Sequence, residues 1–256
     1  MNKYIEKLQE LLKQVNKKHL IAAASAVVIF LLGFVTGCSC SGRHGGDDGP
    51  ELGVSEALDS FALVMPEGSQ IVARFTDKPI DVALTHTHGD HAGSVGCFDH
   101  IWMTKAQGIS VPRGYNGKVS YMDNHQIFDL GGRTLEVFYA PGHTADSVLF
   151  IDEANHIGIS GDAFGSTNLL MNMELSTFIK TARETLAMMY DKRIYYMLPG
   201  HFDGTNAETT KRVYDLLNIA QGVLDGKLVG EPARGNLNRI YTYQGVRFNY
   251  NDRLLR

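Results

Sequence analysis

Seven metal-binding side chains fall in four short clusters along this chain of 256 residues, and their spacing limits the folds that it can adopt. Residues 85–91 hold three histidines and an aspartate, and each later cluster holds one histidine or aspartate beside a glycine. The seven are His86, His88, Asp90, His91, His143, Asp162 and His201. One zinc ion takes about three protein ligands plus a water. Seven ligands are therefore too many for one ion and suit two ions that share a bridging group.

The clusters lie where apolar runs end. Runs typical of buried strands cover residues 80–85, 134–139, 157–160 and 194–198, and a cluster follows each one. The neighbouring glycines let the backbone turn sharply at these points. His86 and His88 are two residues apart, so their side chains point to the same side of an extended backbone. We expect each ligand to lie at a strand end, and imidazoles with carboxylates suit zinc, with iron and manganese as rivals.

The order of these motifs, His-x-His-x-Asp-His and then His, Asp and His, closely resembles that of the metallo-β-lactamase fold superfamily, from about residue 77 to the C-terminus. The resemblance implies an α/β fold, a four-layer αβ/βα sandwich of two mixed sheets with the metals at one edge. It also implies a ligand set for each ion: His86, His88 and His143 for the first, Asp90, His91 and His201 for the second, and Asp162 as the bridge.

The reaction that the resemblance implies is metal-assisted hydrolysis. Two ions about 3.5–4 Å apart hold a bridging hydroxide, which attacks a carbonyl or phosphoryl centre while one ion polarises the oxygen that gains charge. Asp90 is predicted to orient this hydroxide or to relay its proton. Phe164 and residues 169–171 follow the bridging aspartate. They either line the substrate pocket or pack in the core.

Asp162 narrows the choice of subfamily. Antibiotic-hydrolysing members generally lack a bridging aspartate, whereas the branch with glyoxalase II, lactonases and phosphodiesterases carries one. Only 55 residues follow His201, so the helical region with which glyoxalase II binds glutathione is expected to be absent. Gly165 stands where quorum-quenching lactonases have a tyrosine, and His88 stands where flavodiiron proteins have a glutamate.

Three functions stay open. The first is a binuclear zinc hydrolase of small esters, thioesters or lactones. The second is a mononuclear iron dioxygenase of sulfur compounds such as persulfides, which would use His86, His143 and Asp162. The third is a membrane-tethered metal-binding protein without turnover. Metal analysis separates the first two hypotheses.

The charge balance argues against a nucleic-acid partner. Beyond residue 37 the chain has 19 basic and 26 acidic residues, a formal charge of −7. Binding along a phosphate backbone needs clustered lysine and arginine. We therefore predict a small-molecule substrate and no nucleic-acid partner, and the sequence leaves the oligomeric state open.

The N-terminal segment predicts a membrane location. Residues 20–37 form an uncharged apolar run, about 27 Å long as a helix. Lysines precede it, which places the N-terminus in the cytoplasm. The run ends in a sequence that resembles a lipoprotein cleavage box, so Cys38 is lipidated or the run is a signal anchor. The predicted parts are a basic leader at 1–19, a transmembrane or signal segment at 20–37, a linker at 38–50 and an extracytoplasmic catalytic domain at 51–256.

The first sheet is expected to be abridged, or its front to be replaced by the membrane segment. Members of the superfamily open with two or more strands well before the first histidine motif. Here residues 60–65 can supply one strand, and residues 70–75 can supply a second strand or the end of a helix. Hairpins are predicted around Gly131-Gly132 and around Gln244-Gly245.

Several local features complete the prediction. Residues 176–190 have apolar side chains at helical spacing and predict a packing helix. Thr205 and Glu208 predict a capping box that opens the last helix. Cys97 is expected to be a small buried residue, with a thiolate ligand as the alternative. Asp152 is expected to be a solvated turn residue.

Overall fold

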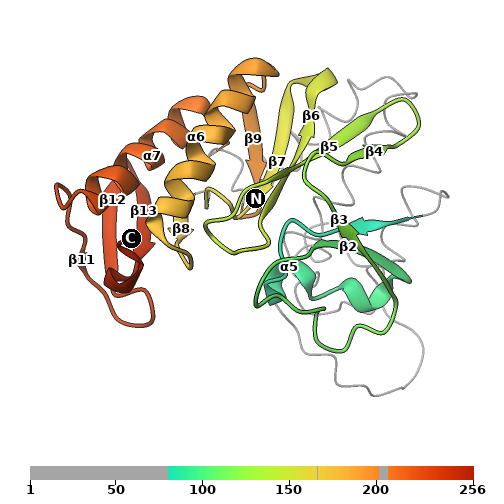
Figure 1. The fold of residues 1–256 in the computed structure, drawn as a ribbon, viewed down its shortest axis with the longest axis horizontal. Helices are drawn as coiled ribbons and strands as arrows, with labels where there is room; N and C mark the ends of the chain where they lie inside the picture. The colour runs from blue at the N-terminus through green and yellow to red at the C-terminus, as the bar shows by residue number, and fades with distance from the viewer. Residues whose placement is uncertain (1–79, 166, 202–206) are drawn as a thin grey trace, which may run out of the picture.

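The computed structural model describes residues 80–165, 167–201 and 207–256, which form an α/β fold (Figure 1). The elements in chain order are β1 (Val82–Ala83), α5 (Gly89–Ala92), η3 (Val95–Cys97), β2 (His100–Thr104), β3 (Lys118–Met122), β4 (Ile127–Asp129), β5 (Thr134–Tyr139), β6 (Val148–Asp152), η4 (Glu153–Asn155), β7 (Ile157–Gly161), β8 (Asn168–Leu170), α6 (Leu175–Asp191), β9 (Tyr196–Pro199), β10 (Glu208–Thr209), α7 (Thr210–Leu224), β11 (Glu231–Pro232), β12 (Arg239–Tyr243), β13 (Val246–Tyr250) and η5 (Asp252–Leu254).

The strands of the described residues form three sheets. A mixed six-stranded sheet has the order β10-β9-β7-β6-β5-β4, in which only β7 and β9 are parallel neighbours. A parallel sheet has the order β1-β2-β3, and a mixed sheet has the order β11-β12-β13-β8. The α/β class with mixed sheets is confirmed. The prediction of two sheets missed the third, which arises because the terminal hairpin pairs with β8 and β11.

The central six-stranded sheet buries both of its faces. Because side chains alternate along a strand, Leu149 and Ile151 of β6 pack under α6 and α7, whereas Val148 and Phe150 pack toward the β1-β2-β3 sheet. Fully burying a side chain such as Phe150 is worth roughly 1.5–3 kcal/mol. Figure 1 shows α6 and α7 side by side on one flank and the smaller parallel sheet on the other.

A third apolar cluster lies on the far face of the parallel sheet. Val82 and Ile101 of β1 and β2 pack there against Ala92 of α5 and Val95 of η3. The layers therefore follow one another as helices, sheet, sheet and helix, which is the layering that the resemblance implied. Cys97 is half-buried and packs against this cluster, outside both groups of candidate metal ligands among the described residues.

Many local predictions are confirmed. The hairpin of β4 and β5 and the hairpin of β12 and β13 are antiparallel pairs at the expected glycine-containing turns. Gln244 and Gly245 have φ of 47° and 79°, as a two-residue type I′ turn requires. Helix α6 covers the predicted range and buries Phe178 and Ala182.

The predicted capping box is wrong. Glu208 lies in β10, where it pairs with Met197 of β9, and its buried carboxylate accepts a hydrogen bond from the Ser160 hydroxyl. Helix α7 begins at Thr210, and the Thr209 side chain caps it by accepting from the Arg212 backbone N–H at 3.3 Å. Strand pairing therefore moved the helix start beyond Glu208. Thr205 lies outside the described residues.

Asp152 is not the solvated turn residue that the sequence predicted. It is 2% exposed at the end of β6 and pairs with the guanidinium of Arg133. Its other oxygen accepts from the backbone N–H of Asn155 at 3.2 Å, which caps η4. Two sets of donors hold this carboxylate, so it is part of the folded core.

The predictions for residues 60–65 and 70–75, for the segment at 20–37 and for Cys38 lie outside the described residues. Within the part of the chain that the structure describes, no helix combines the length and the apolar character needed to cross a bilayer.

Candidate metal centre

The candidate ligands gather at one edge of the six-stranded sheet. His143 lies in the loop between β5 and β6, Asp162 follows the end of β7, and His201 follows the end of β9. In the parallel pair of β7 and β9, Gly161 lies opposite Pro199, and the Gly200 N–H donates to the Gly161 carbonyl at 2.7 Å. This pairing sets Asp162 beside the chain that leads to His201.

The parallel sheet brings the first histidine cluster to the same edge. The Val148 N–H at the start of β6 donates to the Thr85 carbonyl just after β1, at 2.9 Å. The Thr87 N–H donates to the Asp146 carboxylate at 2.8 Å, so a buried side chain of the β5–β6 loop holds the backbone between His86 and His88.

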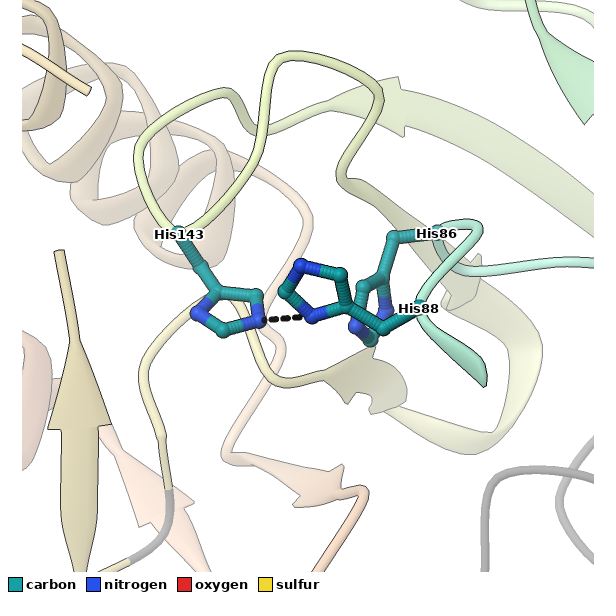
Figure 2. Close-up of side chains that lie close together, drawn as sticks. All are labelled: His86, His88 and His143. Atoms are coloured by element: carbon teal, nitrogen blue, oxygen red, sulfur yellow. Dashed lines mark hydrogen bonds between the residues drawn. The ribbon is translucent and has the colours of Figure 1, made fainter. Parts of the chain in front are cut away.

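His86, His88 and His143 form the first group, with ligand atoms within 4.8 Å of one another. Figure 2 shows their three rings converging, with His143 Nε2 only 3.0 Å from His88 Nδ1. His143 Nδ1 lies 2.7 Å from the Leu170 carbonyl, which can only accept, so Nδ1 carries a proton and donates it. In the neutral ring this leaves the Nε2 lone pair directed at the group, as in metal-binding histidines.

Asp90, His91, Asp162 and His201 form the second group, also within 4.8 Å. Asp162 Oδ2 lies 3.2 Å from His91 Nε2 and 3.3 Å from His201 Nε2. The same oxygen lies 3.8 Å from His143 Nε2 in the first group. Asp90 Oδ2 lies 3.4 Å from His201 Nε2. The fold thus brings all seven residues together, with Asp162 between the two groups.

Burial keeps the inner histidines neutral. It lowers the pKa of His86 to about 2, helped by the neighbouring rings of His91 and His143. Burial also lowers the pKa of His143. A neutral imidazole offers a lone pair to a metal, so both rings are in the form that binds one.

The carboxylates are held ionised. The hydrogen bond from His201 lowers the pKa of Asp90 to about 2. Burial opposes ionisation of Asp162, but the close imidazoles of His201 and His91 hold its pKa well below the ordinary value. In return, Asp162 and Asp90 raise the pKa of His201 to about 10. Two carboxylates that converge on one point stabilise positive charge there. A divalent cation supplies two positive charges at that point, whereas a proton on His201 supplies one.

Buried atoms in both groups test whether the residues fit a metal. Among the described residues, His86 Nε2, His91 Nδ1 and Asp162 Oδ1 are buried without a hydrogen-bond partner. Leaving such atoms unpaired costs about 1–3 kcal/mol each. Nitrogen and carboxylate donors in this arrangement match the ligand chemistry of divalent zinc. The residues present therefore fit divalent metal ions.

Sequence reasoning missed the residues that hold the ligands. A Cβ on Gly200 would lie 2.4 Å from Asp162 Oδ1 and 2.7 Å from His91 Cε1, so this position must be glycine for the two ligands to approach. Asp146 and Glu208 act on the ligand loops through Thr87 and Ser160. The sequence offered a signal for one of these residues only: Asp146 lies three residues after the candidate ligand His143.

Three of the four apolar residues singled out after Asp162 belong to the core. Phe164, Leu169 and Met171 are fully buried and pack with α6 and α7, so the packing interpretation is confirmed for them. Leu170 is partly exposed, and its carbonyl orients His143.

The chain is similar to a known family of proteins. The model of the metallo-beta-lactamase superfamily matches residues 65–201, more than half of the chain. A human acyl-coenzyme A thioesterase is 24% identical over 169 residues, which cover 53% of this chain and 61% of the relative. A hydroxyacylglutathione hydrolase from Rhodopseudomonas palustris is 25% identical, covering 46% of each chain. An atrochrysone carboxyl ACP thioesterase from Aspergillus terreus is 33% identical over 81 residues, covering 32% of this chain and 25% of the relative. The chain thus spans less than two thirds of the length of these relatives.

Proposed function

The chain belongs to the metallo-beta-lactamase superfamily, and we propose that it is a metal-dependent hydrolase of thioesters. One observation carries the proposal: seven ligand-type side chains converge in two groups, with Asp162 between them. The choice of thioesters is supported by the relatives, of which two are named thioesterases and one a hydroxyacylglutathione hydrolase. Small oxygen esters and lactones are the neighbouring substrate classes that the test must compare.

We further propose that the site binds two zinc ions. His86, His88 and His143 would hold the first, Asp90, His91 and His201 the second, and Asp162 would bridge them. The two groups identified by proximity support this division. The 3.8 Å between Asp162 Oδ2 and His143 Nε2 supports the bridging role.

Two such ions, when bound, supply a hydroxide nucleophile at neutral pH and polarise the acyl carbonyl. The protein's own residues orient the ligands and the nucleophile, and they move protons. The Leu170 carbonyl fixes the ring of His143, and Asp146 fixes the loop that carries His86 and His88. Asp90, whose side chain is one third exposed, would orient the nucleophile or relay its proton. A thiolate is a better leaving group than an alkoxide, because its conjugate acid, the thiol, has a pKa near 8.5, which is well below that of an alcohol.

A single-iron dioxygenase is the competing function. It would need only His86, His143 and Asp162, and it leaves the convergence of Asp90, His91 and His201 unexplained. The geometry therefore favours the two-metal hydrolase.

The test is metal analysis with a substrate panel. The purified full chain is expected to hold close to two zinc ions. It should hydrolyse acyl-coenzyme A or acylglutathione faster than matched oxygen esters and lactones, with activity lost to a chelator and restored by zinc. One iron per chain with oxygen-dependent turnover would replace the proposal by the dioxygenase. Two metals without turnover on any ester would leave a metal-binding protein.

We also propose that residues 20–37 tether the domain at 51–256 to the outer face of the cytoplasmic membrane, through lipidation at Cys38 or as a signal anchor. Fractionation and protease protection of the full chain test the location. Loss of fatty-acid labelling in Cys38→Ala would identify the lipoprotein, and full membrane retention without labelling would identify the anchor. A protein recovered entirely from the cytosol would refute both.

A further inference from the structure

A second cluster of reactive side chains lies in the β1-β2-β3 sheet, away from the candidate metal centre. His100 Nδ1 lies 2.9 Å from Asp81 Oδ1, and His100 Nε2 lies 3.0 Å from Ser120 Oγ. Asp81 immediately precedes β1 and His100 opens β2, whereas the candidate metal ligands follow the other end of β1. A carboxylate, an imidazole and a hydroxyl are thus joined in one hydrogen-bonded row.

The parallel register holds this row in place. Trp102 of β2 lies opposite Ser120 of β3, and alternation along β2 puts His100 on the same face as Trp102. Trp102 Nε1 donates to the second oxygen of Asp81 at 3.2 Å, so each carboxylate oxygen has its own donor. The rings of His100 and Trp102 are 5.2 Å apart. These contacts restrict the imidazole to one orientation.

The partners fix the tautomer of the neutral imidazole. The ionised carboxylate of Asp81 can only accept, so His100 Nδ1 must donate to it and carries the proton. The lone pair is then on Nε2, facing the Ser120 hydroxyl. A hydroxyl within hydrogen-bond reach of a base that a third group orients is the arrangement of an activated nucleophile. The side chain of His100 is 16% exposed and Ser120 is half-buried, so a small reagent can reach them.

We propose that Ser120 is a nucleophile activated by His100 and Asp81, and that it reacts with activated acyl or phosphonyl groups without a metal ion. Ser120 Oγ forms a bond to the electrophilic carbon or phosphorus, and the bond from that atom to the leaving group breaks. The hydroxyl proton passes to His100 Nε2 and then to the leaving group. The product is an acylated or phosphonylated serine. This inference does not depend on the proposed thioester hydrolysis.

The competing interpretation is that the row only ties three strands together. It predicts that removing a member lowers stability, and it predicts no unusual reactivity of Ser120. Reactivity toward a covalent probe therefore separates the two roles.

The experiment treats the full chain as purified with a fluorophosphonate and maps the adduct by peptide mass spectrometry. Ser110, an exposed serine of the same region, is the internal control. We expect Ser120 to react about 10²-fold faster than Ser110, which is the low end of general-base catalysis. Asp81→Asn and His100→Gln should each remove most of this advantage. Ser120→Ala should carry no adduct there and should keep the metal-dependent activity.

Asp81→Asn is the decisive variant because the Asp81 side chain is 59% exposed, so its loss should leave the fold intact. Equal reaction rates at Ser120 and Ser110 in the folded chain would overturn the proposal. So would an undiminished Ser120 rate in a folded Asp81→Asn protein.

Discussion

Gly200→Ala tests whether close backbone approach positions the candidate ligands. The added Cβ would meet Asp162 Oδ1 at 2.4 Å, whereas real Cβ contacts stay above 3.0 Å, so the carboxylate must move by at least about 0.6 Å. His91 Cε1, at 2.7 Å, must move by about 0.3 Å. Both are candidate ligands of the second ion. We expect metal affinity to fall by at least about 10-fold, as for changes beside a ligand, and kcat/KM by about 10²-fold, as for a 1 Å misplacement.

The assay measures metal per chain by mass spectrometry and turnover on the best thioester of the panel. Overpacking typically costs about 1–3 kcal/mol, so the free energy of unfolding is measured as well. Gly96→Ala is the matched control, because a Cβ there meets nothing within 4 Å. If Gly200→Ala keeps full metal content and turnover within twofold of the parent, the reasoning from close approach is wrong.

Three further predictions concern single side chains. Asp162→Asn should lose at least one ion, and its rate should fall by about 10²-fold or more. Asp191→Asn, the control at an exposed carboxylate, should keep both its metal and its rate. Metal analysis and kinetics of the two variants test this prediction. His88→Ala should cost more activity than metal, since six candidate ligands remain, and full turnover with one metal bound would refute the two-metal mechanism. Asp152→Ala should destabilise the fold by about 3–5 kcal/mol, because it leaves the guanidinium of Arg133 without its buried partner, while metal content of the folded protein stays unchanged. Denaturant unfolding and metal analysis of Asp152→Ala test this prediction, and an unchanged denaturation midpoint would contradict it.

Several features of the fold could be predicted from local sequence alone. The range of β5 was predicted correctly because its alternating apolar residues set the strand and the glycines before it set the turn. The Gln244-Gly245 hairpin follows from residues that tolerate positive φ. These patterns depend on neighbours within a few residues, so no knowledge of the rest of the chain was needed.

The gathering of the seven candidate ligands was predicted for a different reason. Each follows a strand. Strands β5, β7 and β9 run in the same direction in the six-stranded sheet and end at one edge, and β1 of the parallel sheet ends beside them. The sequence therefore determined which residues meet. Their roles as ligands and the catalytic role of Asp90 stay predictions.

Only the tertiary structure decided which polar residues would be buried and paired. The sequence predicted Asp152 as a turn residue, but the structure pairs it with Arg133. It predicted Glu208 as part of a helix cap, but Glu208 lies in β10, which pairs with β9. In the same way, Ser120 meets His100 only because two strands are parallel neighbours. Sequence spacing cannot reveal such partners, because they come from distant segments that meet only when the layers pack. Burial then decides their energy, since a polar group removed from water must find its partner inside the protein.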